Sequence, residues 1–351
     1  MSIAEGNPEI TPVRDVHRFD EGSLHRYMQA NVAGFQGPLS IRQFEGGQSN
    51  PTFLLTDGGG RRYVMRKKPP GELLPSAHAV DREFRVIKAL AGTGVPVAPA
   101  LALCEDASVI GTAFYIMAFV EGRILRRLDL PGVSPADRAR TYDAMNDSLA
   151  RIHNVDVAKV GLADFGRPGN YFARQFSRWA RQYEASKTEE IPAMTRLMAW
   201  LEKNMVEDDR TTLVHGDFRL ENMIFHPTDP KVLAVLDWEL ATLGNPLSDL
   251  AYNCMPYYVF DQGRGSLRGA DVAALGIPAE KDYVAAYCQR TGRSKIEHWN
   301  FYLAFNCFRL AAIMQGVYAR GLRGQAASKS ALERGARAKE MAAIGADLAG
   351  A

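Results

Sequence analysis

The residues best suited to chemistry lie close together between positions 213 and 239. An apolar segment leads into Asp217, Asn222 follows five residues later, and a second apolar segment ends at Asp237, fifteen residues beyond Asn222. Phosphoryl transfer needs such a set, because one carboxylate orients the attacking hydroxyl while an Asn and a second carboxylate hold Mg²⁺ on the phosphates. The sequence therefore predicts Asp217 as the catalytic base and Asn222 and Asp237 as magnesium ligands.

Three polar residues beside this set need separate interpretation. His215 belongs to the predicted catalytic set, as a brace that hydrogen-bonds the loop rather than as a reactant. Asp249 is predicted to be structural, either capping the helix that begins near Leu247 or tying down the catalytic loop. Glu239 could approach the substrate or a second metal, or could equally be a solvated charge at the end of a strand.

Phosphoryl transfer also needs a cation that pairs with a helix carboxylate and touches the α- and β-phosphates. The alternation of the strand around it favours Arg66. Lys67 is the alternative, since a one-residue shift of register would turn it to the other face of the sheet. Glu83 is the predicted partner, although it could instead be an exposed helix residue near Arg82 and Arg85.

The first third of the chain predicts the sheet that would carry this cation. Strand patterns and Gly-rich turns alternate with one amphipathic helix at 79–90. The predicted strands are 39–45, 50–56, 62–67, 99–104 and 113–119, with turns at 46–49 and 57–60. Three strands, a helix and two strands in this order describe a small α+β lobe of about five strands.

After Gly122 the pattern becomes helical. Ser134 is a good N-cap and Pro135 suits the first helical position, so a helix is predicted from there to His153. Further helices are expected at 171–186, at 194–205 and from 283 onward, with a buried hairpin of 223–225 and 232–236. The expected domains are an N-terminal extension (1–35), a nucleotide-binding N-lobe (36–118) and a C-lobe with the catalytic loop and substrate site (119–351).

In order along the chain, these motifs resemble a known enzyme family. HGDFRLEN followed by LDWE is similar to the aminoglycoside phosphotransferase/choline kinase type of small-molecule kinase. FEGGQSNPTFLL, YVMRKKP, DREFRVIKAL and FYIMAFVEGR resemble its nucleotide loop, third strand, paired helix and hinge. The segments RKKPPGELLPSAHAVDREFRVIKAL and VLDWELATLGNPLSDLAY look most like the branch fused to, or encoded beside, acyl-CoA dehydrogenases.

The resemblance implies a two-lobed protein-kinase-like fold of the α+β class, with a small antiparallel N-lobe sheet, one paired helix and a mainly helical C-lobe. It implies ATP, bound in the cleft between the lobes, and Mg²⁺ as cofactors. It assigns nucleotide contacts to the glycine-containing loop and the hinge, namely Gly46, Gly47, Ser49, Met117, Ala118 and Val120. Read alone, the first segment is a polar turn and the second a core strand. Choline kinases also use Arg at the position of Arg66.

The acceptor is inferred from charge and from the same resemblance. The basic, aromatic segment 170–179 resembles a helix near the substrate entrance, which makes Tyr171, Arg174 and Arg178 candidate substrate residues. Residues 290–351 contain ten Lys/Arg and four Asp/Glu. Such a surface fits an anion, with a hydroxyacyl-CoA as the first choice, better than a polycationic aminoglycoside. Basic helices also commonly present only a solvated face.

Other functions stay open at this point. An amino alcohol, a sugar or an aminoglycoside is possible because the fold does not determine the substrate, and Glu239 with Asp261 could line a site for a cation. A nucleotide-binding pseudokinase is possible because Arg66 replaces the commoner Lys. A protein kinase is disfavoured because HGDF and DWE replace HRDL and DFG. The expected partners are a small-molecule hydroxyl substrate and, through a functional link, an acyl-CoA dehydrogenase.

The overall composition excludes several classes of protein. The 351 residues are 46% hydrophobic and 23% charged, with a net charge of +2, so neither disorder nor a nucleic-acid partner is indicated. No apolar run is long enough to cross a bilayer, and the polar start of the sequence does not look like a secretory signal. The four scattered cysteines favour neither a disulfide framework nor a zinc site, and the expected location is the cytoplasm.

Overall fold

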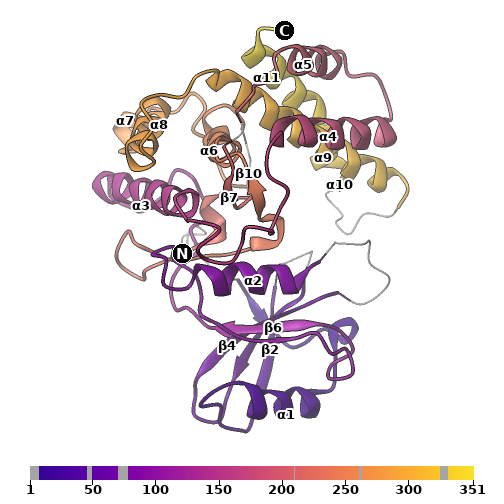
Figure 1. The fold of residues 1–351 in the computed structure, drawn as a ribbon, viewed down its shortest axis with the longest axis vertical. Helices are drawn as coiled ribbons and strands as arrows, with labels where there is room; N and C mark the ends of the chain where they lie inside the picture. Colours follow the sequence, from indigo (N-terminus) through magenta and orange to yellow (C-terminus); the bar gives the residue numbers. More distant parts are fainter. Residues whose placement is uncertain (1–7, 46–49, 70–77, 209, 261–262, 325–330) are drawn as a thin grey trace. The chain divides into compact units, whose positions relative to one another are not determined.

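The computed structural model describes residues 8–45, 50–69, 78–208, 210–260, 263–324 and 331–351. Its contacts divide the chain into two compact units (Figure 1). Unit 1 takes its described residues from 1–126, 158–162 and 219–241, and unit 2 from 127–157, 163–218 and 242–351. The segment 219–241, which contains Asn222 and Asp237, therefore packs with the N-terminal part of the chain. The domain bounds expected at 36 and 119 stay a prediction.

A six-stranded antiparallel sheet forms the centre of unit 1, in the order β1-β2-β3-β4-β6-β5. The strands are β1 (Ile10–Thr11), β2 (Ser40–Phe44), β3 (Thr52–Thr56), β4 (Arg62–Lys67), β5 (Ala100–Cys104) and β6 (Phe114–Ala118). The expectation of about five strands was one short. The additional strand, β1, pairs only Ile10 and Thr11 with β2, and two residues are too few to show an alternating pattern.

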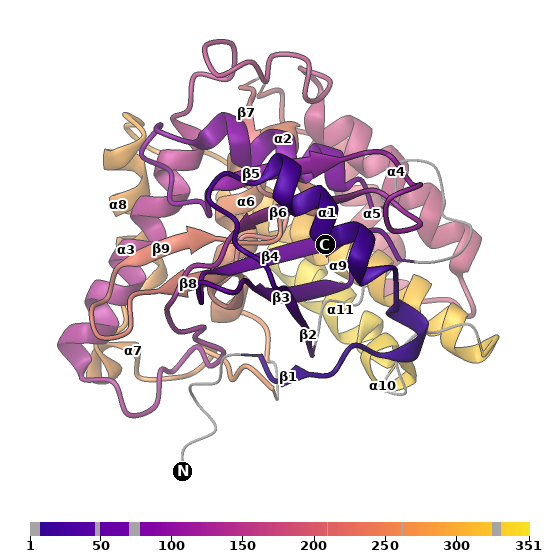
Figure 2. The ribbon, with the colours of Figure 1, turned by 90° about the horizontal axis from the view of Figure 1, so that it is seen from below.

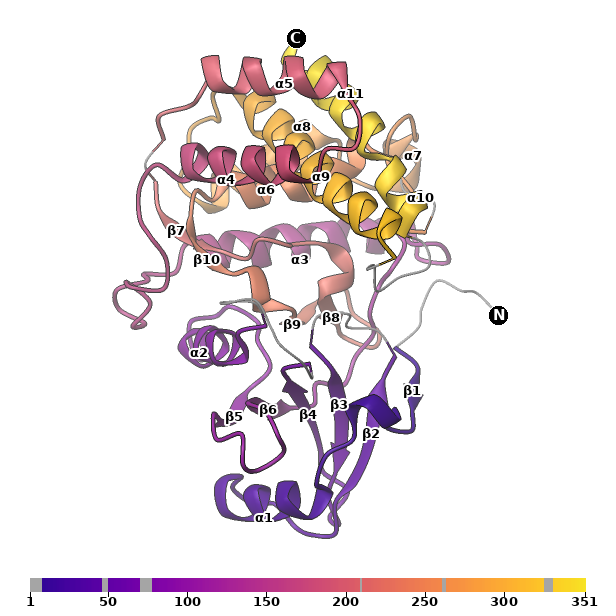
Figure 3. The same cartoon turned by 90° about the vertical axis from the view of Figure 1, so that its right-hand side faces the viewer.

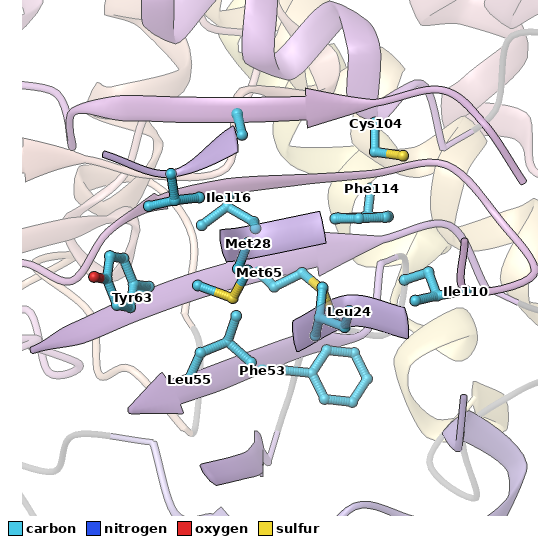
Figure 4. Packing of buried hydrophobic residues seen from close by; sticks show 12 residues of the cluster. Leu24, Met28, Phe53, Leu55, Tyr63, Met65, Cys104, Ile110, Phe114 and Ile116 are labelled. Carbon is cyan, nitrogen blue, oxygen red and sulfur yellow. The ribbon is translucent and has the colours of Figure 1, made fainter. Parts of the chain in front are cut away.

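One face of this sheet is covered by a helix that the sequence pattern did not predict, α1 (Glu21–Asn31) (Figure 2). Leu24 and Met28, one helical turn apart, are completely buried against Phe53 and Met65 of the sheet (Figure 4). Only these two side chains of α1 are buried among otherwise polar residues, which explains why no apolar stripe was visible.

The other side of the sheet, which carries Arg66, faces α2 (Val80–Leu90) and the hairpin of β8 (Met223–Phe225) and β9 (Val232–Val235). Phe225 exchanges two backbone hydrogen bonds with Arg123, and the Val235 N–H donates to the carbonyl of Pro96. These bonds attach the hairpin to unit 1. The short 3-10 helices η2 (Leu220–Asn222) and η3 (Trp238–Leu240) flank it.

Unit 2 is mainly helical, and α9 runs through its middle (Figure 3). Side chains of α9 are buried along most of its length, against α4, α5, α6, α10 and α11. Strands β7 (Thr212–Val214) and β10 (Thr242–Gly244) pair beside these helices. The helices are α3 (Pro135–His153), α4 (Tyr171–Ser186), α5 (Pro192–Lys203), α6 (Leu247–Cys254), α7 (Val272–Leu275), α8 (Glu280–Arg290), α9 (Trp299–Leu322), α10 (Ala331–Ala336) and α11 (Ala338–Ala349).

Most predicted elements are confirmed, some of them exactly and the others to within three residues at either end. The helix predicted after Ser134 is α3, with the Ser134 side chain accepting from the Asp137 N–H as an N-cap. The helical C-terminal region is divided into α8, α9, α10 and α11 rather than being continuous. Among the described helices, none is both long and apolar enough to cross a bilayer.

Candidate active site

The loop after β7 is held in place by the buried carboxylate of Asp249. The backbone N–H groups of His215 and Gly216 donate to Oδ2 and Oδ1 of Asp249, at 2.6 and 2.9 Å. Gly216 has φ of +84°, a left-handed conformation that favours glycine, so the loop can bend here and present both N–H groups to one carboxylate. Asp249 therefore ties down the catalytic loop, one of the two structural roles considered from the sequence.

Asp249 also contacts the ring of His153, which in turn contacts Tyr287. The His153 ring contacts Asp249 Oδ2 through Nε2 at 3.3 Å, and its Nδ1 lies 2.7 Å from the Tyr287 hydroxyl. If the tyrosine donates to Nδ1, the proton on Nε2 points to the carboxylate. Burial acts to raise the pKa of Asp249, but the hydrogen bonds from His153 and from the His215 N–H lower it overall. Burial lowers the pKa of His153, which favours the neutral ring.

His215 lies in the catalytic loop but is completely buried. Its Nδ1 accepts the backbone N–H of Asp217 at 3.2 Å, and its ring meets Phe218 edge-on at 5.9 Å. A side chain with no exposed surface that hydrogen-bonds the backbone of Asp217 can position this residue but cannot itself reach a substrate. The geometry fits the brace expected from the sequence.

Two residues missed by sequence reasoning lie at Asp217. The Tyr252 hydroxyl donates to Asp217 Oδ1 at 2.7 Å, and Arg309 Nη2 donates to the Gly216 carbonyl at 2.7 Å. Tyr252 could have been found, because it follows Asp249 by three residues on α6 and so shares its face. Arg309 comes from α9, more than ninety residues away, and no local pattern marks it.

In unit 1 the β8–β9 hairpin brings the two expected metal ligands to one end. Met223 pairs with Val235, and the Leu236 N–H donates to the Asn222 carbonyl at 2.8 Å. Asn222 lies just before β8 and Asp237 lies just after β9, so the two residues are at the same end of the hairpin. Asp237 has φ of +64°, a left-handed conformation that aspartate tolerates better than most residues.

Arg66 joins Asp237 to Glu83. Its Nη2 donates to Asp237 Oδ1 at 3.0 Å, and its Nε lies 3.2 Å from Glu83 Oε2, close enough for an ion pair although the N–H is not aligned for a hydrogen bond. Lys67 points to the opposite face of the sheet, where its ammonium lies 5.7 Å from the ring centre of Phe19. Of the two candidate cations, Arg66 is thus the one beside the carboxylates.

The Glu83 carboxylate also receives two neutral donors. Asn50 Nδ2 donates to Oε1 at 2.7 Å and the Tyr115 hydroxyl to Oε2 at 3.0 Å. Burial raises the pKa of Glu83, and Asp237 adds to this, so that Arg66 offsets the effect only in part. Burial also opposes the charge of Arg66, but Glu83 and Asp237 raise its pKa overall. Two carboxylates share one guanidinium, which leaves this cluster short of positive charge.

This donor set suits a magnesium ion. Mg²⁺ prefers oxygen ligands, usually one or two protein carboxylates completed by phosphates and water. Asp237 and the Asn222 side chain supply oxygens of that kind, and the excess of negative charge around Arg66 favours a cation. Among the described residues, no group of three or more His, Cys, Asp or Glu could form a cage for a metal by itself. The residues present therefore fit a metal shared with a phosphate-bearing ligand.

The other residues predicted to contact the nucleotide are only partly described. Gly46, Gly47 and Ser49 lie outside the described residues. Met117 is buried in β6, opposite Val64. The backbone N–H of Ala118 donates to the Pro99 carbonyl at 2.9 Å, so this donor is not available to an adenine base. Val120 is half-buried just after β6.

The expected substrate residues differ in their surroundings. Tyr171 is buried, with its ring against Gly244, where a Cβ would come within 2.5 Å of the tyrosine ring. Arg174 donates to the carbonyls of Pro168 and Arg167, and Arg178 is exposed beside the Trp179 ring. Glu239, in η3 of unit 1, is near enough to influence the pKa of Arg66, and Asp261 lies outside the described residues.

Comparison with known sequences identifies a family and several relatives that match nearly the whole of this chain. The model of the phosphotransferase enzyme family matches residues 40–295. Acyl-CoA dehydrogenase family member 10 of Mus musculus is 49% identical over 98% of this chain, and family member 11 of Gallus gallus is 47% identical over 99%. The chain spans 32% and 45% of these two relatives, less than half of either.

Solved structures agree with this match. A Ralstonia eutropha protein provisionally named an aminoglycoside phosphotransferase is 53% identical, with a TM-score of 0.88 over 95% of this chain and 99% of its own. Spectinomycin phosphotransferase APH(9)-Ia, solved with ADP and spectinomycin, has 13% identity and a TM-score of 0.61 over 95% and 98%. The predicted α+β kinase-like fold, with its antiparallel sheet and helical C-terminal region, is confirmed.

Proposed function

The chain belongs to the phosphotransferase enzyme family, and from that premise we propose that it transfers the γ-phosphoryl group of ATP to a hydroxyl group of a small molecule, with Mg²⁺. The observation that carries the proposal is the support of Asp217. Its loop is held through two backbone N–H groups by Asp249, and its carboxylate accepts a hydrogen bond from Tyr252. A carboxylate positioned in this way can receive a proton without moving.

The proposed reaction gives each of these groups one role. The acceptor hydroxyl gives its proton to Asp217 as its oxygen bonds to the γ-phosphorus, and the bond from that phosphorus to the β,γ-bridging oxygen breaks to release ADP. Arg66, oriented by Glu83, pairs with the α- and β-phosphates. Asn222 and Asp237 would hold Mg²⁺, which supplies charge neutralisation on the phosphates when bound.

The catalytic role of Asp217 is tested with Asp217→Asn. We expect phosphoryl transfer to fall on the order of a thousandfold, because the amide cannot accept the proton, while the affinity for the Mg²⁺ complex of a non-hydrolysable ATP analogue stays within about twofold. Asp347→Asn, an exposed change on α11, is the matched control. Full activity of Asp217→Asn would show that another group is the base.

For the acceptor, we propose an anionic metabolite that carries a hydroxyl group, with a hydroxyacyl-CoA as the leading candidate. Two relatives of high identity are named acyl-CoA dehydrogenase family members, which supports a functional link to such a dehydrogenase. The excess of Lys and Arg from position 290 onward supports an anionic acceptor.

For the location, we propose the cytoplasm. All four cysteines are unpaired, in keeping with a reducing compartment of this kind.

A parallel screen separates the acceptor classes. ATP consumption and phosphorylated product are measured with hydroxyacyl-CoAs, choline-like alcohols, sugars and aminoglycosides. We expect turnover of hydroxyacyl-CoAs. Turnover of an aminoglycoside with none of an acyl-CoA would overturn the proposed acceptor. Nucleotide binding without transfer to any of these compounds would favour a pseudokinase.

A further inference from the structure

Two side chains from different helices of unit 2 flank the catalytic base. Tyr252 of α6 donates to Asp217 Oδ1, and Arg309 of α9 donates to the carbonyl of the preceding residue, Gly216. The guanidinium carbon of Arg309 lies 5.6 Å from the ring centre of Tyr252, within the range of a cation–π contact. The tyrosine and the arginine thus contact each other as well as the catalytic loop.

Tyr252 lies where the acceptor must arrive. A hydroxyl that loses its proton to Asp217 has to come within about 2.6–3.2 Å of this carboxylate. The Tyr252 hydroxyl is already 2.7 Å from one of its oxygens. Any acceptor that reaches the base therefore also comes close to this phenol.

Arg309 has hydrogen-bonding capacity beyond its contact with the loop. A guanidinium has five N–H donors. Within the described part of the chain, Arg309 donates to the Gly216 carbonyl and forms no ion pair with a carboxylate. It is only partly exposed, so water does not solvate it fully, and a guanidinium in this state favours an oxygen-bearing ligand.

Resting on the proposed function, we infer that Tyr252 and Arg309 are the acceptor-recognition pair, which selects a hydroxyl compound that carries a carbonyl or carboxylate oxygen a few bonds from the reacting hydroxyl. The short separation follows from the chain itself. Arg309 is hydrogen-bonded to the carbonyl of Gly216, the residue next to Asp217, and consecutive Cα atoms are only about 3.8 Å apart. The other N–H donors of Arg309 therefore lie near the base. A fixed positive charge at this position also disfavours a polycationic acceptor.

The first test measures binding of candidate acceptors in the presence of Mg²⁺ and a non-hydrolysable ATP analogue. The probes are the α-, β- and γ-hydroxybutyrates, their CoA thioesters, and sec-butanol, which lacks the second oxygen. We expect at least one hydroxybutyrate and its thioester to bind the unmodified protein, and Arg309→Met to weaken both by about tenfold or more. Arg309→Lys should restore part of the affinity, because it restores the charge without the planar donors.

Arg61→Met is the matched control, because Arg61 also donates to a backbone carbonyl, that of Ala33, and also lies beside a tyrosine ring, that of Tyr63, but is exposed in unit 1. Binding that is equal in Arg309→Met and the unmodified protein would overturn the inference. So would the absence of binding by every hydroxybutyrate and thioester, or a loss confined to the thioesters, which would place Arg309 on the distal CoA phosphates instead.

The second test separates recognition from mere support of the loop. Tyr252→Phe should raise the KM for the acceptor by about tenfold and lower kcat by less, because the phenol contacts the acceptor as well as Asp217. A fall in kcat with an unchanged KM would indicate a purely structural role and overturn the inference for Tyr252. If hydroxybutyrates bind in an Arg309-dependent way but receive no phosphate, the proposed function fails while the recognition pair stands.

Discussion

Each unit contains one deeply buried carboxylate beside its own predicted site residues, and the two carboxylates are held in opposite ways. In unit 2, Asp249 accepts from two backbone N–H groups and a histidine ring. In unit 1, Glu83 is held by the side chains of Arg66, Asn50 and Tyr115. The pKa of Asp249 is lowered and that of Glu83 is raised, although burial acts to raise both.

This difference in hydrogen-bond donors predicts a different role for each carboxylate. The backbone donors to Asp249 belong to the loop itself, so Asp249 fixes the path of the chain at Asp217. These N–H groups cannot turn away to other hydrogen-bond partners. Side-chain donors can rotate to other partners, and Arg66 is shared between Glu83 and Asp237. Arg66 can therefore turn towards a phosphate, and Asp237 towards a metal, without any change in the fold. We expect Asp249 to determine stability and Glu83 to determine nucleotide affinity.

The largest effect is expected from Asp249→Asn. The amide keeps the shape but turns an NH₂ group towards a donor, so a buried N–H of His215 or Gly216 loses its acceptor. We expect the free energy of unfolding, measured in urea, to fall by about 3 kcal/mol. Asp347→Asn is the exposed control. A loss of unfolding free energy no greater than that of the control would contradict the structural role assigned to Asp249.

A smaller effect, on binding rather than on folding, is expected from Glu83→Gln. Without the negative charge, Arg66 is left to Asp237 and is no longer oriented towards the phosphates. Calorimetry should show about tenfold weaker binding of the Mg²⁺ complex of a non-hydrolysable ATP analogue, or about 1.4 kcal/mol. Glu105→Gln, an exposed change after β5, is the control. Unchanged affinity, or a loss of stability as large as that of Asp249→Asn, would contradict the assigned roles.

Tyr115→Phe should have a smaller effect still. It removes one neutral donor from Glu83 Oε2 and leaves Arg66 and Asn50 in place. We expect the free energy of unfolding to fall by about 1 kcal/mol, with little change in nucleotide affinity. A loss of affinity that matched Glu83→Gln would show that the phenol, and not the carboxylate charge, orients Arg66.

The finest distinction is the sign of the pH dependence. Because the folded pKa of Asp249 is lowered, its contribution to stability is present above the unfolded value of about 3.9 and is lost as pH falls through the folded pKa. Because the folded pKa of Glu83 is raised, its contribution is complete below the unfolded value of about 4.3 and is lost as pH rises through the folded pKa.

Unfolding of the unmodified protein, Asp249→Asn and Glu83→Gln is therefore compared between about pH 3 and pH 8. The difference made by Asp249→Asn should shrink on acidification. That made by Glu83→Gln should move in favour of the variant as pH rises above about 4. The same slope for both variants would mean that the two carboxylates do not differ in the way described.

Much of the candidate site could be proposed from the sequence because its residues are separated by short spacings. Asp217 and Asn222 are separated by one loop, and Asp237 ends the strand that pairs with the strand after Asn222. The alternation of β4 favoured Arg66 over Lys67, since neighbouring residues of a strand face opposite sides. Helices α2, α3 and α4 were predicted because each has a regular apolar stripe or a strong N-cap.

The parts that were missed depend on contacts between distant segments. The helix α1 buries only Leu24 and Met28, and β1 pairs only two residues with β2. Asn50, just before β3, reaches Glu83 of α2, and Arg309 of α9 reaches Gly216. None of these residues differs in type or spacing from many surface residues in the chain.

The sequence by itself determined the α+β order of elements and proposed a set of reacting groups, because residue type, strand alternation and helical period act over a few residues. Only the tertiary structure decided which donors satisfy each buried carboxylate and therefore what each one does. A buried charge must take its partners from whatever segments the fold brings within about 3 Å. For Asp249 these are backbone N–H groups that stay in place, and for Glu83 they are side chains that can move.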